Sequence, residues 1–82
     1  MSSAPLAIVT GAAEGIGWAT AQQLAQAGWT VALFDMNGPR VAERARALGA
    51  QHSGWACDVT NADEVKARVH DVVAQHLSLI HI

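Results

Sequence analysis

The sequence predicts an α/β fold, namely the N-terminal half of a doubly wound parallel sheet built from three βα units. Two observations lead to this prediction. Three short apolar runs alternate with three segments whose apolar residues recur at helical spacing, and such alternation implies right-handed crossovers and a parallel sheet. In addition, 51% of the 82 residues are hydrophobic and only 15% are charged, which is typical of a globular domain rather than a disordered chain.

The first unit is a strand over residues 6–10 followed by a helix over residues 15–27. The strand is a short apolar run that contains β-branched residues and ends at a glycine. Gly28 supplies the stop signal for the helix. The spacing predicts a buried helix face formed by Ile16, Ala19, Thr20, Gln23, Leu24 and Ala27.

The second unit is an apolar strand over residues 29–34, a turn over residues 35–39, and a helix. Pro39 suits the first helical position, and Gly49 closes the helix. The inner face of this helix is predicted to contain Val41, Ala45 and Leu48.

The third unit gives a weaker strand signal over residues 51–59. Thr60 or Asn61 is expected to cap the following helix, whose first turn carries two acids that its dipole favours. Its apolar face is predicted to consist of Val65, Val69, Val72, Val73 and His76. Residues 77–82 are apolar but fit no helix well. We therefore expect the strand order 3-2-1, with residues 77–82 as a candidate fourth strand beside the first.

A glycine-rich run, Thr10-Gly11-Ala12-Ala13-Glu14-Gly15-Ile16-Gly17, joins the first strand to the first helix. Gly11 permits a tight turn, Gly15 allows the backbone to approach a pyrophosphate, and Gly17 allows close packing of the helix. The free N–H groups and the positive dipole end of the helix would then face the anion. A glycine-rich turn without any ligand is the alternative interpretation of this run.

Asp35, at the end of the second strand, favours a nucleotide cofactor over a plain turn. A carboxylate at this position can accept hydrogen bonds from both adenosine ribose hydroxyls and would repel a 2′-phosphate. Glu14 adds negative charge to the loop. Both acids favour NAD over NADP. The alternatives are a turn-forming role for Asp35 and an exposed loop position for Glu14.

These motifs resemble the N-terminal part of a short-chain dehydrogenase/reductase. Three segments carry the resemblance: the glycine-rich run after the first strand, Asp35, and Cys57-Asp58-Val59-Thr60 at the end of the third strand. The resemblance implies a Rossmann fold and assigns cofactor contacts to Gly11, Gly15, Ile16 and Gly17 (pyrophosphate), Asp35 and Met36 (ribose), and Asp58 and Val59 (adenine). For Asp58, a helix-capping role is the alternative.

The resemblance also implies chemical groups that this sequence does not contain. The family transfers hydride between a nicotinamide and an alcohol or carbonyl, with a Tyr that moves the proton and a Lys that lowers the pKa of that Tyr. The chain has no Tyr, and Lys66, its only Lys, lies on the predicted third helix. We therefore expect no catalytic residues and no dehydrogenase activity in this chain. A non-catalytic nucleotide-sensing or assembly module of Rossmann type is the alternative function.

We expect residues 1–76 to form a partial NAD-binding domain and residues 77–82 to be a non-native tail. The last six residues match the translation of a transposon-end adapter used in sequencing libraries. The native gene is then expected to continue past His76. A longer parent protein would bind a small-molecule substrate and, by the resemblance, form homo-oligomers.

Composition excludes several other partners. The net charge is −2 and the cations are scattered, which argues against nucleic acid. No segment reaches the roughly 20 apolar residues of a membrane helix. Cys57 is the only cysteine, and the four histidines lack metal-ligand spacing, so we expect no metal site and assign the histidines to surface or helix-end roles. The N-terminus lacks the basic region of a signal peptide, and a cytoplasmic location is expected.

Overall fold

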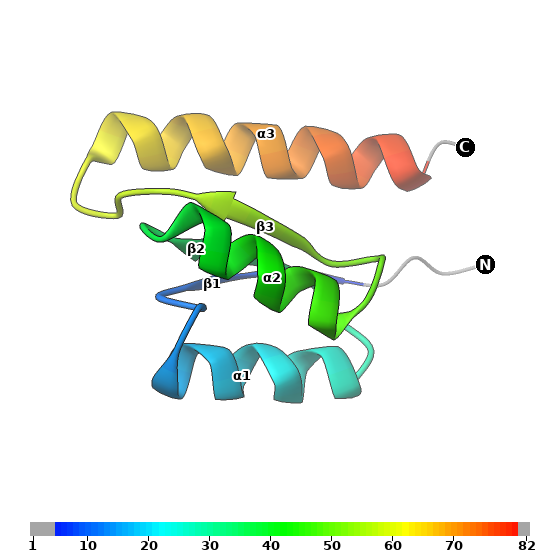
Figure 1. Cartoon of the computed structure of the whole chain (residues 1–82). Coiled ribbons are helices and arrows are strands. Elements are labelled where there is room, and N and C mark those ends of the chain that lie inside the picture. Colours follow the sequence, from blue (N-terminus) through cyan, green and yellow to red (C-terminus); the bar gives the residue numbers. More distant parts are fainter. Residues whose placement is uncertain (1–4, 81–82) are drawn as a thin grey trace.

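A computed structural model describes residues 5–80 of the chain. Strands and helices alternate along the chain (Figure 1) in the order β1 (Leu6–Thr10), α1 (Gly15–Gln26), β2 (Thr30–Asp35), α2 (Gly38–Leu48), β3 (Ser53–Ala56) and α3 (Ala62–Ile80). The three βα units expected from the sequence are therefore confirmed. The third strand is shorter than predicted, because only its central residues pair with β2.

The sheet is parallel throughout the described residues, with the order β1-β2-β3. Its register pairs Val9 with Leu33 and Leu33 with Gly54. The predicted order 3-2-1 is the same arrangement read from the other edge. β2 lies in the centre, and its four residues from Val31 to Phe34 are completely buried.

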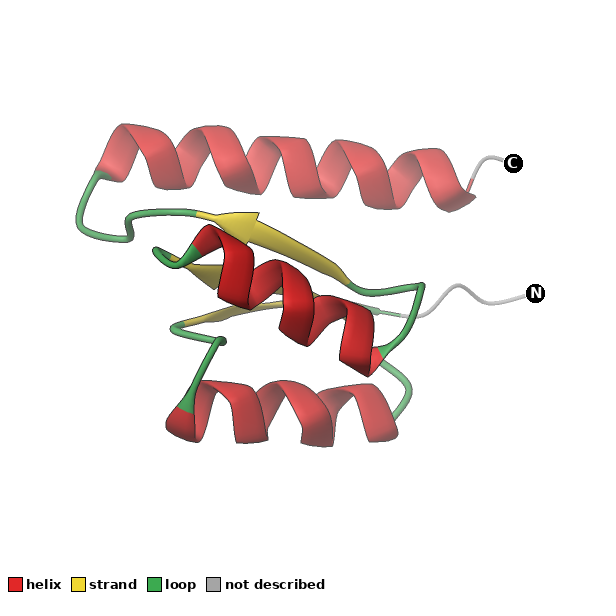
Figure 2. Cartoon of the chain, in the orientation of Figure 1, coloured by secondary structure: helices red, strands yellow, loops and turns green. Residues whose placement is uncertain are grey.

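The sheet is covered on both faces (Figures 1 and 2): α1 and α2 lie on one side and α3 lies on the other. Alternate residues of β2 accordingly enter two separate clusters. Val31 and Leu33 pack with the α1–α2 layer, whereas Ala32 and Phe34 pack with Cys57 and the α3 residue Val72. The sheet thus holds the two helical layers apart and fixes which strand ends meet at its edge.

The buried face of α1 differs from the predicted one. Ala21 is fully buried, and Trp18, Leu24 and Ala25 pack against the core. Ile16 is 87% exposed, and of the six residues predicted to be inside only Leu24 is partly buried, while the other five are exposed. The prediction was wrong because small residues (Gly, Ala and Thr) are spread around this helix, so helical spacing alone could not select the face that carries the large Trp18 ring.

α3 is longer than the sequence predicts. The backbone of residues 77–80 continues the helix, and the expected fourth strand does not form there. Within residues 5–80, β1 therefore has a neighbour on one side only. On the predicted apolar face of α3, Val72 is buried, while Val73 is 40% exposed. The Asn61 side chain accepts a hydrogen bond from the Glu64 N–H (3.1 Å), so Asn61 is the cap, one of the two predicted candidates.

His52 is buried, contrary to the surface or helix-end role expected from the sequence. It is 8% exposed, and its Nδ1 accepts a hydrogen bond from the N–H of Val31 in β2 (3.0 Å). Burial lowers the pKa of the His52 imidazole. Among residues 5–80, no helix combines the length and apolar character needed to cross a membrane.

Candidate cofactor-binding site

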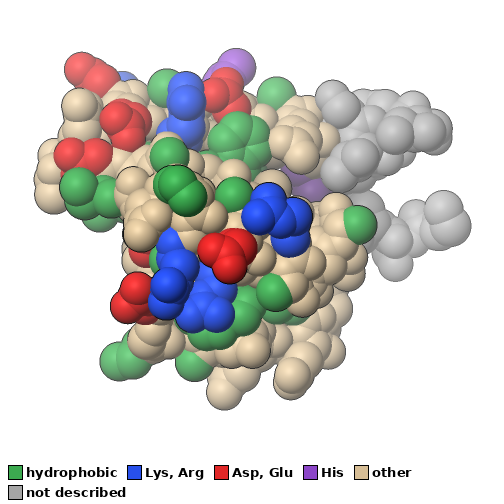
Figure 3. Space-filling view, viewed as in Figure 1, with side chains coloured by type: hydrophobic (Ala, Val, Ile, Leu, Met, Phe, Trp, Pro, Cys, Tyr) green, Lys and Arg blue, Asp and Glu red, His purple; other side chains and the backbone are tan. Residues whose placement is uncertain are grey.

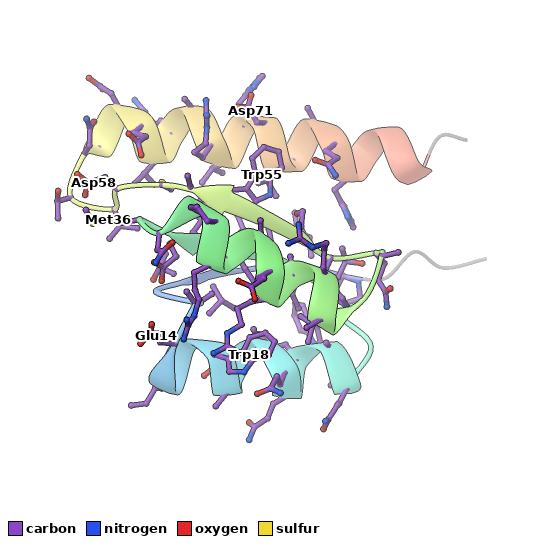
Figure 4. The ribbon with its side chains drawn as sticks, viewed as in Figure 1. Glu14, Trp18, Met36, Trp55, Asp58 and Asp71 are labelled. Atoms are coloured by element: carbon purple, nitrogen blue, oxygen red, sulfur yellow. The ribbon has the colours of Figure 1, made fainter. Side chains whose placement is uncertain are left out.

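The candidate site lies at the edge of the sheet where the parallel strands end. The loop after β1, the turn after β2 and the segment after β3 meet at this edge, and each leads toward the start of a helix. Glu14, Met36 and Asp58 belong to these three connections and lie at the same end of the molecule (Figure 4). In an open parallel sheet this edge is where ligands usually bind.

The glycines of the first loop have the properties that their predicted roles require. Gly11 and Gly15 have φ values of 61° and 60°, a region that residues with a Cβ rarely adopt. A Cβ on Gly17 would lie 2.1 Å from the carbonyl oxygen of Gly11. The start of α1 therefore packs directly on the loop backbone. Ile16, the neighbour of Gly17, is exposed at this helix start.

The Asp35 carboxylate connects this loop to the turn after β2. Its Oδ2 accepts a hydrogen bond from the N–H of Ala13 (3.1 Å), and its Oδ1 accepts one from the N–H of Asn37 (3.0 Å). Each carboxylate oxygen can accept more than one hydrogen bond, so Asp35 can hold the loop and still accept from a ligand hydroxyl. The turn interpretation and the ribose interpretation of Asp35 are thus compatible.

Glu14 is mostly exposed and lies beside Arg40, a basic residue to which the sequence analysis assigned no role. One of its carboxylate oxygens lies 3.4 Å from Nη2 of Arg40, at the start of α2. In Figure 3, basic and acidic side chains lie side by side on the face that α2 presents. An exposed pair of this kind contributes little to stability, but Arg40 offsets the negative charge that Glu14 brings to the loop.

A second arginine on α2, Arg44, contacts the loop backbone directly. Its Nε donates a hydrogen bond to the carbonyl oxygen of Ala13 (2.9 Å), and its guanidinium lies over the ring of Trp18, 4.8 Å from the ring centroid. Sequence analysis did not identify this residue. The only available signal was the pair of arginines one helical turn apart on α2, close behind Asp35.

A hollow of about 650 Å³ lies beside the ends of β2 and β3 and the start of α3. Two predicted site residues, Met36 and Asp58, line it, whereas Val59 is 48% exposed and is not among its lining residues. The remaining lining residues are Ala56, Cys57, Asn61, Asp63, Glu64, Ala67 and Arg68. Sequence analysis assigned no ligand contact to any of these seven.

Hydrogen bonds fix the polar groups around this hollow. Asp58 Oδ1 accepts from the N–H (3.0 Å) and the hydroxyl (2.6 Å) of Thr60, and these bonds lower the pKa of the Asp58 carboxyl. Asp58 thus forms a local turn with Thr60 and does not cap α3. The Asp58 N–H donates to the Glu64 carboxylate. The pKa of Cys57 is raised, mainly because the thiol is buried and also because Glu64 is close.

Two further observations concern the charged and metal-binding side chains. In the part of the chain that the structure describes, no three His, Cys, Asp or Glu side chains are grouped closely enough to hold a metal ion. In this same part, the Nε of Arg68 is buried without a hydrogen-bond partner, and an Nη of Arg68 pairs with Asp71 at 2.9 Å. The arrangement offers glycine-loop backbone, a helix start and carboxylates, which are groups that bind a nucleotide through phosphate and hydroxyl contacts.

Comparison with known proteins agrees with this description. The family model described as short chain dehydrogenase matches residues 5–82. A D-threitol dehydrogenase from Mycolicibacterium smegmatis is 44% identical over 77 residues, covering 85% of this chain and 28% of the relative. This chain therefore corresponds to less than a third of the length of the threitol dehydrogenase.

Two solved structures share the fold. One is the 3-ketoacyl-(acyl-carrier-protein) reductase from Brucella melitensis complexed with NADH, with a TM-score of 0.83 and 25% sequence identity. The match covers 88% of this chain and 30% of the reductase chain. The other is a metagenomic short-chain oxidoreductase in complex with NADP, with a TM-score of 0.79 and 32% sequence identity. The match covers 88% of this chain and 34% of the oxidoreductase chain. The family match over residues 5–82 and these likenesses agree: the chain belongs to the short-chain dehydrogenase family.

Proposed function

We propose that this chain is the cofactor-binding part of an NAD-dependent oxidoreductase that transfers hydride between NAD(H) and an alcohol or carbonyl substrate. The single observation that supports this best is the contact between the Asp35 carboxylate and the N–H of Ala13, 3.1 Å apart. It brings the acceptor for ribose hydroxyls directly against the glycine loop. A dinucleotide needs both groups in that order along its length.

The described residues fit such a cofactor. Because Gly17 packs directly on the Gly11 carbonyl, the start of α1 lies against the loop, and its free N–H groups can approach a pyrophosphate. Asp35 and Met36 would meet the adenosine ribose, and Asp58 with Val59 would meet the adenine beside the hollow. The bound nicotinamide would supply the hydride chemistry, while the residues of this chain bind and orient the cofactor.

We propose NAD rather than NADP as the cofactor. An additional phosphate on the ribose would place negative charge next to Asp35, and Glu14 would add to the repulsion. Arg40 opposes this preference, because its guanidinium is 3.4 Å from Glu14 and could instead pair with a phosphate. Asp35 therefore carries the greater share of the proposed selectivity.

The catalytic groups would come from a longer protein. The chain spans about three tenths of the length of the relatives it matches. The 82-residue chain contains no Tyr, so we propose that this chain alone has no dehydrogenase activity. In the longer protein a Tyr and Lys pair would act on a small-molecule substrate, in a cytoplasmic homo-oligomer. We further propose that residues 77–82 are a non-native tail, which resequencing of the source gene tests.

Calorimetric titration of the chain with NAD and NADP tests the cofactor proposal. We expect NAD to bind at least tenfold more tightly than NADP. In Asp35→Asn the neutral amide should reduce this ratio to threefold or less, because the repulsion of the 2′-phosphate is lost. Glu43→Gln removes one charge from the exposed side of α2 and should leave the ratio unchanged. Equal or tighter binding of NADP by the unaltered chain would refute the role given to Asp35.

The alternative, a non-catalytic nucleotide-binding module, predicts the same binding but a different longer protein. Sequencing of the complete gene separates the two. A Tyr-x-x-x-Lys motif downstream, together with oxidation of an alcohol by the complete protein, would support the enzyme. Cofactor binding by a complete protein that lacks this motif would favour the module.

A further inference from the structure

We propose that Arg44 is a positioning residue that holds the glycine loop in its phosphate-binding conformation; this inference rests on the proposed function. Arg44 lies on α2, outside the loop and far from it in sequence. Its Nε nevertheless donates a 2.9 Å hydrogen bond to the carbonyl oxygen of Ala13, in the middle of the loop. No cofactor contact is required of Arg44 itself.

The backbone of Ala13 is held on both of its polar atoms. Its N–H donates to Asp35 Oδ2 (3.1 Å), and its carbonyl accepts from Arg44 (2.9 Å). Ala13 itself is only 2% exposed. Two side chains from different elements, β2 and α2, therefore determine where this residue lies and how its peptide group is turned.

The loop needs such an anchor because of its glycines. Gly11 and Gly15 flank the three residues between them, and both have positive φ values that glycine adopts easily. Glycine also loses the most conformational freedom on ordering, so a loop bounded by two glycines is costly to fix when a ligand binds. A preformed hydrogen bond to the segment between them reduces that cost and raises affinity.

The bond also fixes a peptide plane. The peptide group between Ala13 and Glu14 is planar, and in the trans form its C=O and N–H point in opposite directions. Because Arg44 draws the Ala13 carbonyl toward α2, the Glu14 N–H must point away from α2. A rotated peptide would instead direct the negative end of the Ala13 carbonyl away from α2, where it would oppose an anion at the loop.

Trp18 keeps the guanidinium in place. The Arg44 guanidinium carbon is 4.8 Å from the centroid of the Trp18 ring, within the range of a cation–π interaction. Trp18 in turn packs against the core from α1. The planar Nε–H of arginine can stack and donate at the same time, which the flexible amine of lysine cannot reproduce.

The test compares ligands that contain the pyrophosphate with one that lacks it. ADP-ribose contains the adenosine and the pyrophosphate, whereas adenosine lacks any phosphate. For Arg44→Met we expect ADP-ribose and NAD to bind at least fivefold more weakly, with a change of less than twofold for adenosine, measured by calorimetry and ligand-observed NMR. Arg46→Met, on the exposed side of the same helix, should change none of these three affinities by more than twofold.

The outcomes separate this inference from the proposed function. An equal loss for both ligands would show a general structural effect and would overturn the positioning role, as would unchanged binding of ADP-ribose. If the unaltered chain binds neither NAD nor ADP-ribose, the proposed function fails and this inference fails with it. Should Arg44→Met not fold, Arg44→Lys serves in the same comparison. It keeps the charge but lacks the stacked Nε donor, and a selective loss for ADP-ribose of at least threefold is expected.

Discussion

His52 shows how a single side chain can make the core sensitive to pH. Its Nδ1 accepts a hydrogen bond from the Val31 N–H, so that nitrogen must carry no proton in the folded chain. The pKa of the buried imidazole is lowered from its ordinary value of 6.5. The unfolded chain therefore takes up a proton more readily than the folded chain when the pH falls.

We expect the free energy of unfolding to decrease as the pH is lowered below about 6.5, because the folded pKa of His52 lies below the unfolded value. The contribution is fully present above pH 6.5 and is lost as the pH approaches the folded pKa. Urea titrations between pH 7.5 and 5.5 measure it. His52→Gln removes the titrating group, so this pH dependence should become flatter.

His70→Gln is the matched control, since His70 is an exposed residue of α3. It should retain the pH dependence of the unaltered chain. A His52→Gln variant whose stability still falls as steeply with pH would contradict the role assigned to this imidazole.

Residues whose roles follow from local backbone rules could be anticipated from the sequence. Gly11 and Gly15 have the positive φ values that a tight loop implies, and Gly17 occupies the close contact expected of a third glycine. Arg44 and His52 could not be anticipated. Each bonds a backbone group far along the chain, and such pairs exist only once the sheet and helices have assembled.

At the scale of the elements, existence and order were predictable while the orientation of helices was not. The apolar runs and the Gly, Asn and Pro signals identified each strand and helix start. In α1, small residues lie around the whole helix, so the sequence did not indicate which face is buried. In the structure, the buried face is the one on which Trp18 packs against the core. The glycine within β3 is likewise explained only by tertiary packing. A Cβ on Gly54 would lie 2.6 Å from the Val41 carbonyl oxygen of α2, so α2 requires a residue without a side chain there.

The two adjacent valines of α3 allow a direct test of its orientation. Val72 is 2% exposed and packs with Phe34, whereas Val73 is 40% exposed. Val72→Ala should lower the free energy of unfolding by about 2 kcal/mol, because two methyl groups leave a packed cluster. Val73→Ala should change it by no more than about 0.5 kcal/mol, as exposed substitutions usually do. Comparable losses in both variants, measured by urea unfolding, would mean that α3 is rotated.

At the scale of the whole molecule, the edge formed by β1 is expected to favour association between chains. In the described residues β1 pairs only with β2, and its sequence Leu-Ala-Ile-Val is apolar. A strand edge of this kind can pair with another chain. We expect the weight-average sedimentation coefficient to rise with protein concentration.

A lysine at this edge should reduce that association. Thr10→Lys places a charge at the exposed end of β1, and charged edge residues oppose strand pairing between molecules. Thr20→Lys adds the same charge on the exposed surface of α1 and should leave the association as it is. If the unaltered chain keeps the sedimentation coefficient of a monomer at every concentration, the expected association through β1 is contradicted.

The order of the strands in space has a further consequence for how the sheet can assemble during synthesis. Because β1, β2 and β3 lie side by side in the order in which they are made, each new strand meets a neighbour that has already left the ribosome. Leu6 pairs with Thr30 and Ala32 with Ser53, so each closure spans one helix and its connections. Contacts that are near in sequence close quickly. The glycine-rich loop and its contact with Asp35 can thus form before α3 packs on the sheet.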